Sequence, residues 1–175
     1  MTDLANNYED WTRALQLANL LAVAHLAGYQ FASDKIALHN ILQLGDKETV
    51  VKQWFRGWDF GRKYGPTMVC GTAGVFGFLA WKDGTASPAF LYNLTASVLS
   101  IFVAPYTQFR IFPLNDKLLR EYKTCVDKKK TDGTSDGVSL EVVREWAAEW
   151  KRLDMHRQLL AYLAAISGLV AVLKT

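Results

Sequence analysis

Four apolar stretches dominate this chain and constrain its fold more than any other feature. Each approaches the ~20 residues that a helix needs to cross the ~30 Å hydrocarbon core of a bilayer. If all four stretches cross a membrane, the even number of crossings puts both termini on the same side. The stretches are residues 14–31, 67–81, 90–109 and 159–173.

The positive charge of the chain is divided unequally between the segments that connect these stretches. Segments 34–64 and 110–157 would share the side opposite to the termini, and they carry 17 of the 20 Lys and Arg residues. Such an excess is typical of the cytosolic face of a membrane protein. We therefore predict an all-α fold, a four-helix transmembrane bundle with cytosolic helical extensions. It would form a single domain over residues 1–175, with both termini on the non-cytosolic side.

Composition narrows the range of partners. Half of the residues are hydrophobic, yet the mean hydropathy is only +0.02 because the two polar segments offset the apolar stretches. A net charge of +3 is too small to indicate nucleic acid. The basic residues lie among 13 of the 17 acidic ones, so we expect a solvated surface that contacts the headgroups of membrane lipid. Association of the chain into a homo-oligomer is left open.

Local signals indicate where helices begin and end. Gly45-Asp46 breaks the first cytosolic segment, and Pro66 is expected in the first turn of the second crossing. Pro113 stops or bends the helix that follows the third crossing. Ser139 is a good N-cap, and it precedes a single long helix predicted over residues 140–173.

Small and polar residues predict which face of each crossing is buried, because lipid gives apolar side chains little reason to associate with one another. They recur at spacings of three, four and seven residues, and plain helix packing explains most of them. These stripes comprise Ala18, Ala22, His25, Tyr29 and Ser33 in the first crossing, Cys70, Gly74, Gly77 and Trp81 in the second, Asn93, Ser97, Ser100, Ala104 and Thr107 in the third, and Trp146, Trp150, Asp154, Arg157, Ala161, Ala164, Gly168 and Ala171 in the fourth.

Two ionisable members of these stripes are candidates for function. His25 lies well inside the first crossing, and Arg157 starts the fourth on its inward face. Ionisable groups are costly in such places and indicate a functional site, although a hydrogen-bonded core imidazole and a snorkelling boundary arginine are structural alternatives. His156 would face lipid as an interfacial anchor. The three histidines are too scattered to predict a metal site, and no phosphate-binding loop or nucleophile elbow is present in the sequence.

Three motifs at predicted helix boundaries together resemble one family. Residues 58–66 follow the pattern aromatic-x-x-Gly-x-x-x-x-Pro, with Trp58 where Tyr is usual. Residues 107–118 follow Thr…Pro-x-Asn-x-x-Leu, and residues 150–157 follow Trp-x-x-Leu-x-x-x-Arg. The order and spacing of these motifs, over nearly the whole chain, resemble the anthrone oxygenase-like membrane proteins, many of them fungal. One departure is Asp154, which stands where that family has His or Asn.

This resemblance implies that an anthrone is oxidised to an anthraquinone by O2, without an added cofactor or metal, during the biosynthesis of an aromatic polyketide. Such a reaction needs a base, a cation that stabilises the enolate or superoxide, and an apolar slot for a flat ring. The implied catalytic residues are Arg157 as the cation, Asp154 or His25 as the base, and Asn115 as a hydrogen-bonding group. The implied substrate-binding residues are Trp58 and Trp150, which offer stacking surfaces, with Thr107 and Arg110.

Two alternatives stay open at this point. The chain could carry out another transformation of an aromatic polyketide, such as C–C cleavage. It could instead be a non-catalytic membrane scaffold for a biosynthetic partner, which would need only the small-residue stripes. In each case we expect an integral membrane protein of the endoplasmic reticulum or a related vesicle membrane.

Overall fold

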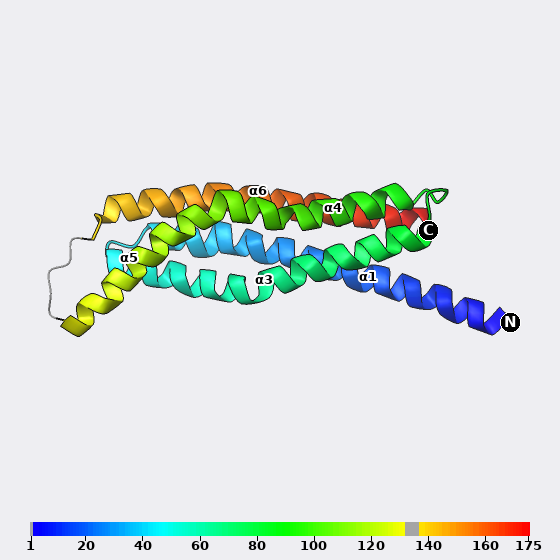
Figure 1. Cartoon of the computed structure of the whole chain (residues 1–175), viewed down its shortest axis with the longest axis horizontal. Helices are drawn as coiled ribbons and strands as arrows, with labels where there is room; N and C mark the ends of the chain where they lie inside the picture. Colours follow the sequence, from blue (N-terminus) through cyan, green and yellow to red (C-terminus); the bar gives the residue numbers. More distant parts are fainter. Residues whose placement is uncertain (1, 132–136) are drawn as a thin grey trace. The chain divides into compact units, whose positions relative to one another are not determined.

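The computed structural model describes residues 2–131 and 137–175, and within these ranges it contains helices and no strand (Figure 1). The predicted all-α class is therefore confirmed. The elements are α1 (Thr2–Ala32), the π-helix η1 (Ser33–Leu38), α2 (His39–Leu42), α3 (Lys47–Asp83), α4 (Phe90–Tyr106), the π-helix η2 (Thr107–Ile111), α5 (Phe112–Thr131) and α6 (Leu140–Lys174).

Two helix starts follow the predicted local signals. The break between α2 and α3 includes Gly45-Asp46, and the Asp46 Oδ2 accepts hydrogen bonds from the Thr49 amide at 2.8 Å and hydroxyl at 2.6 Å. Ser139 Oγ accepts a hydrogen bond from the Val142 amide at 3.4 Å at the start of α6. Each side chain satisfies a backbone donor that has no partner within its helix. The prediction of one long helix over residues 140–173 is confirmed by α6.

Pro66 and Pro113, the two prolines for which a helix boundary was predicted, occupy different positions within their helices. Pro66 lies in the interior of α3, so the prediction that it opens a separate helix is wrong. A proline removes one intrahelical hydrogen bond, which the long helix tolerates here. Pro113 lies in the first turn of α5, directly after η2. The wider turns of a π-helix there change the helical register without ending the helix.

The chain forms two compact units. The first combines the residues up to Gly28 with Gly65–Pro105 and Gln158–Thr175, and the second combines Tyr29–Tyr64 with Tyr106–Arg157. Helices α1, α3, α4 and α6 each contribute residues to both units. The prediction of a single domain over residues 1–175 stays a prediction.

The first unit is held by apolar packing and by side chains that hydrogen-bond to backbone carbonyls. Asn19 Nδ2 donates to the Thr72 carbonyl at 3.2 Å, and Ser167 Oγ donates to the Tyr92 carbonyl at 2.8 Å. Such bonds between helices are typical of packing in membranes. The buried apolar residues of this unit include Val23, Leu26, Val69, Phe76, Leu79, Ala96, Val103 and Ala164.

The predicted buried stripes are partly correct. Ala161, Ala164, Gly168 and Ala171 of α6 are buried, as predicted. The stripe predicted for residues 67–81 is wrong, because the buried face of that part of α3 is formed by Val69, Ala73, Phe76 and Ala80 instead. Small residues occur at helical spacings on more than one face of a helix, so their size alone does not identify the packed face. The exposed members of the predicted stripes are Ala18, His25, Cys70, Gly74, Trp81 and Ala104.

Two helical stretches within the described residues are long and apolar enough to cross a membrane, namely Phe90–Val126 and Leu140–Lys174. A helix of the length of α6 extends roughly 50 Å, which exceeds the ~30 Å hydrocarbon core, so only its apolar second half matches a crossing. The helical stretches that contain residues 14–31 and 67–81 do not meet this criterion of length and apolarity. These findings give weak support for a membrane protein, and the predicted four-span bundle is not confirmed.

The second unit has its own core, to which η1, α3, η2, α5 and α6 contribute. Phe55 and Tyr122 stack with their ring centroids 3.9 Å apart. Lys47 Nζ donates to Glu121 Oε1 at 2.6 Å and to the Val138 carbonyl at 2.7 Å. These bonds join the start of α3 to α5 and to the segment that precedes α6. The buried apolar residues are Leu38, Val50, Val51, Trp54, Ile111, Leu114, Leu118, Cys125, Val143, Trp150 and Leu153.

Candidate functional site

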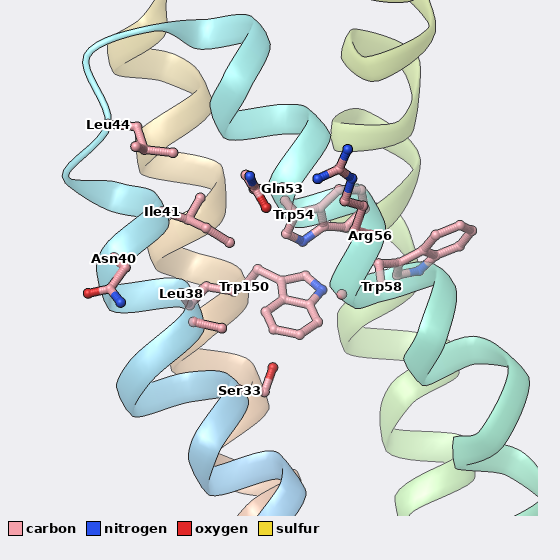
Figure 2. Close-up of a pocket in the computed structure, with 12 residues that line it drawn as sticks. Ser33, Leu38, Asn40, Ile41, Leu44, Gln53, Trp54, Arg56, Trp58 and Trp150 are labelled. Carbon is pink, nitrogen blue, oxygen red and sulfur yellow. The ribbon is translucent and has the colours of Figure 1, made fainter.

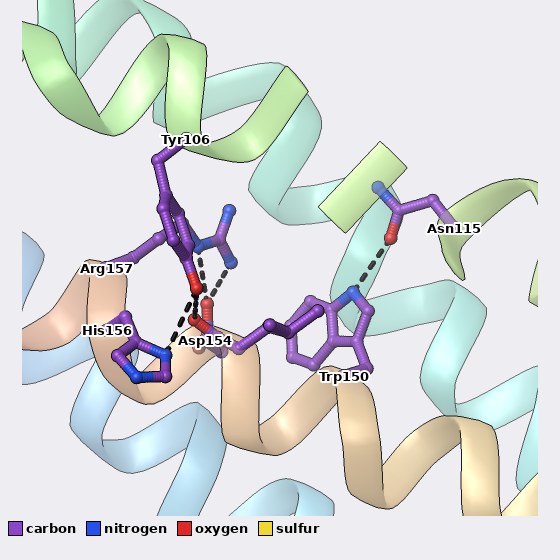
Figure 3. A network of polar contacts seen from close by, with 7 residues as sticks. Tyr106, Asn115, Trp150, Asp154, His156 and Arg157 are labelled. Atoms are coloured by element: carbon purple, nitrogen blue, oxygen red, sulfur yellow. Dashed lines mark hydrogen bonds and ion pairs between the residues drawn. The ribbon is translucent and has the colours of Figure 1, made fainter. Parts of the chain in front are cut away.

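Among the described residues of the second unit, the most buried ion pair joins Asp154 and Arg157, three positions apart on α6. The Arg157 Nε donates to Asp154 Oδ1 at 2.7 Å, and a second guanidinium nitrogen donates to the same oxygen (Figure 3). Asp154 is only 1% exposed, whereas Arg157 is partly buried. A buried carboxylate needs such a partner, since taking its charge out of water is costly. The helical spacing of three residues brings the two side chains together.

The pKa of Asp154, which precedes the apolar half of α6, is subject to opposing effects. Burial raises the pKa of this carboxyl, while the charge and the hydrogen bond of Arg157 lower it; the negative charge of Asp34 raises it further. Burial has the largest effect, so the pKa of Asp154 lies above the usual range. The surroundings of Asp154 therefore disfavour its charged form, and the Arg157 partner offsets part of that effect.

Asp34 is a second buried carboxyl that sequence reasoning missed. It lies in η1, is 0% exposed, and neither of its oxygens accepts a hydrogen bond from the described part of the chain. The Lys35 Nζ lies 3.2 Å from Asp34 Oδ2, as an ion pair without hydrogen-bond geometry. The sequence offered no signal for this burial, because Asp34 begins a polar segment. π-Helical turns such as η1 are frequent at functional sites.

Trp150 lies one turn before Asp154 on α6 and is fixed from two sides. Its Nε1 donates to Asn115 Oδ1 of α5 at 2.8 Å, and both residues are buried (Figure 3). The Arg157 guanidinium carbon lies 5.6 Å from the centre of the Trp150 ring, within the range of a cation–π contact. Asn115 therefore holds the indole, and the indole lies beside the ion pair.

A cavity of about 430 Å³ opens beside this indole. Trp150 packs edge-on against Trp54, with the ring centroids 6.5 Å apart, and Trp54 stacks on Trp58 at 5.8 Å (Figure 2). Volumes of roughly 300–1,000 Å³ are typical of sites for small molecules. The walls are formed by Ser33, Ala37, Leu38, Asn40, Ile41, Leu44, Gln53, Trp54, Arg56, Gly57, Trp58 and Trp150.

Tyr106 approaches the same turn of α6 from the end of α4. Its hydroxyl lies 3.2 Å from the Leu153 carbonyl oxygen and 3.1 Å from His156 Nδ1 (Figure 3). His156 is exposed, as expected for a residue predicted to face away from the bundle. The tyrosine hydroxyl is a partner for it that the sequence pattern did not indicate.

The structure thus gathers four of the predicted site residues into one cluster, namely Arg157, Asp154, Asn115 and Trp150, with Trp58 on the wall of the cavity. His25 belongs to the first unit and is exposed, so the expectation that it lies on a buried face is wrong. The rest of the described chain therefore leaves the imidazole of His25 uncovered. Its assignment as a base stays a prediction.

Thr107 and Arg110 are not gathered at the cavity. Both lie in η2, where Thr107 is partly buried and Arg110 is exposed, and neither lines the cavity. Their assignment as substrate-binding residues stays a prediction. Within residues 2–131 and 137–175, no three histidine, cysteine or carboxylate side chains come together as a metal site would require.

Comparisons with known proteins agree on one family. A sequence model described as anthrone oxygenase matches residues 54–167. Anthrone oxygenase encC of Aspergillus fumigatus is 26% identical over 171 residues, which cover 88% of this chain and 93% of the relative. Anthrone oxygenase nsrD of Aspergillus novofumigatus is 24% identical over 75% of each chain. An anthrone oxygenase of Claviceps purpurea is 26% identical over 84% of this chain and 82% of its own. No solved structure matches this chain significantly.

Proposed function

This chain belongs to the anthrone oxygenase family, and we propose from this premise that it oxidises an anthrone-type aromatic polyketide to an anthraquinone with O2. The observation that carries the proposal is the cavity walled by the indoles of Trp54, Trp58 and Trp150, with the buried Asp154–Arg157 pair adjoining Trp150. Flat aromatic walls suit a flat ring system. A buried carboxyl and a cation supply the acid–base and electrostatic functions that the chemistry needs.

The proposed reaction changes one carbon of the anthrone. A base removes a proton from the methylene, which leaves an anion delocalised over the ring system and the carbonyl. The anion passes an electron to O2, and recombination forms a C–O bond as a hydroperoxide. Loss of water from the hydroperoxide gives the second carbonyl. One O2 is consumed and one water is released for each anthraquinone, so the substrate itself supplies the electrons and no added cofactor is required.

Residue roles follow from the contacts of the second unit. Arg157 would stabilise the developing negative charge, because a guanidinium in a water-poor site acts more strongly than one at a surface. Asp154 is our first candidate for the base. Asp34 is added as a second, because it is buried and its oxygens accept no hydrogen bond from the residues that the structure describes. His25 is retained as a third. Asn115 would act by holding Trp150 rather than by contacting the substrate.

We further propose that all four apolar stretches cross a membrane of the endoplasmic reticulum or a related vesicle, with both termini on the non-cytosolic side. The two apolar helical stretches and the 17 basic residues of segments 34–64 and 110–157 support this orientation. The second unit, which holds the cavity, contains both of these segments, so the cavity would lie at the cytosolic rim. An apolar polyketide would reach it from lipid or from that rim.

The assay for this proposal is the rate of quinone formation. Purified protein mixed with an anthrone in air-saturated buffer is expected to raise the quinone absorbance faster than the spontaneous reaction does. The alternatives give other results. A product in which a ring has been opened would indicate C–C cleavage. An unchanged rate together with a stably bound biosynthetic enzyme would indicate a scaffold.

A further inference from the structure

The cavity of the second unit has an uneven distribution of charge. Most of its wall is apolar or aromatic, and its polar side chains are one hydroxyl, two amides and one guanidinium. Arg56 supplies the guanidinium, and no carboxylate is among the residues that line the cavity. The site therefore offers a bound molecule one full positive charge and no negative charge to oppose it (Figure 2).

Arg56 differs from other arginines of the second unit in its contacts with the described residues. Arg62, further along α3, pairs with Asp59 at 2.8 Å, and Arg144 donates to the Leu44 carbonyl at 2.5 Å. Arg56 is exposed and makes no hydrogen bond or ion pair with the residues that the structure describes.

We infer that the cavity binds a flat aromatic acid, with its rings among the indoles and its carboxylate on the Arg56 guanidinium. A guanidinium presents parallel N–H donors that match the two oxygens of a carboxylate. The amides of Asn40 and Gln53 offer further donors on the same wall. This inference rests on the proposed function and narrows its substrate to anthrones that carry an acidic substituent.

The expected strength of this contact follows from the exposure of Arg56. A solvent-exposed ion pair contributes little to affinity, so the preference for the acid should be modest, about two- to fivefold. It should also weaken as the ionic strength rises, because salt screens exposed charges. Stacking of the rings would supply the rest of the affinity and would not depend on the charge.

The test compares two probes that differ in charge, anthracene-2-carboxylate and its neutral primary amide. Binding to the purified full-length protein is followed by quenching of tryptophan fluorescence, which needs no turnover. Wild type is expected to bind the carboxylate two- to fivefold more tightly than the amide. Arg56→Gln should remove this preference and leave the affinity for the amide unchanged, whereas Arg56→Lys should keep part of it. Arg120→Gln, which removes an exposed arginine outside the cavity, is the matched control and should behave as wild type.

Three results would overturn the inference. Equal binding of the two probes by wild type, an undiminished preference in Arg56→Gln, or an equal loss in Arg120→Gln would each exclude a specific carboxylate contact at Arg56. The proposed function is measured separately by the oxidation assay. Oxidation without any charge preference would refute this inference alone, and an Arg56-dependent preference without oxidation would refute the proposed reaction alone.

Discussion

Trp150 and Asn115, 35 residues apart in sequence, are joined by a hydrogen bond of 2.8 Å between the indole Nε1 and the amide Oδ1, and both side chains are buried. Asn115→Ala is expected to destabilise the protein by about 1–3 kcal/mol, because it leaves the indole N–H unpaired in the interior. Thermal unfolding measures this loss. In a double-mutant cycle with Trp150→Phe, the two changes should couple by about 1 kcal/mol. Strictly additive effects would contradict the assigned contact.

The Arg157–Asp154 pair gives the sharpest prediction for activity. Arg157→Gln is expected to lower turnover by on the order of 10²–10³, as the loss of one charge-stabilising donor typically does. It also leaves the buried Asp154 without its partner, so some stability should be lost as well. Asp154→Asn combined with Arg157→Gln should recover the stability without recovering the turnover.

His156→Gln is the matched control for that experiment. His156 adjoins Arg157 in sequence, but it is exposed and its ring contacts the Tyr106 hydroxyl. Its replacement should change turnover by less than roughly tenfold, because it removes no group from the buried pair. Equal effects of His156→Gln and Arg157→Gln, or a harmless Arg157→Gln, would show that the site on α6 is wrongly assigned.

Substitution of Gly168 by alanine tests the packing of the first unit. A Cβ added to this residue would lie 2.6 Å from Phe76 Cζ, so Gly168→Ala should lower the melting temperature, and Phe76→Leu should partly relieve the clash. Gly74→Ala is the matched control, because a Cβ there meets nothing within 4 Å. It should be neutral or slightly stabilising. If the two alanine variants melted alike, the close approach of α6 to Phe76 would be refuted.

The orientation in the membrane can be measured by labelling single cysteines. Cys125 is buried and unsuited to this purpose, so the natural cysteines are replaced and Lys123→Cys or Thr85→Cys is introduced at exposed positions. In sealed vesicles whose cytosolic face is outward, an impermeant thiol reagent should label Lys123→Cys at once, but Thr85→Cys only after permeabilisation. The reverse pattern, or simultaneous labelling of both, would contradict the proposed topology.

Part of this fold and site could be predicted from the sequence because the signals are local. The Gly45-Asp46 break, the Ser139 cap and the buried stripe of α6 each depend on residues a few positions apart. Asp154, Arg157, Trp150 and Asn115 were expected in one site for another reason, namely that the motifs at residues 107–118 and 150–157 resemble those of one family.

The remainder depends on packing between distant segments. In the sequence Asp34 begins a polar segment, which predicts an exposed residue. Only the tertiary structure reveals that it is fully buried. His25 occurs at a spacing that fits a buried stripe, yet the packed face of α1 includes Asn19 and Val23 instead. The π-helices η1 and η2 also shift the register of the faces that follow them, which a regular helical period does not anticipate.

The oxidation assay tests the central claim most directly when the protein has first been treated with a chelator and dialysed. We predict that such protein still converts an anthrone to its anthraquinone faster than the spontaneous rate, with one O2 consumed per quinone formed, and that Arg157→Gln protein does so far more slowly. Loss of activity on chelation, restored by one particular metal ion, would contradict cofactor-free oxidation. A quinone absorbance that rises no faster than in protein-free buffer would contradict the proposed function itself.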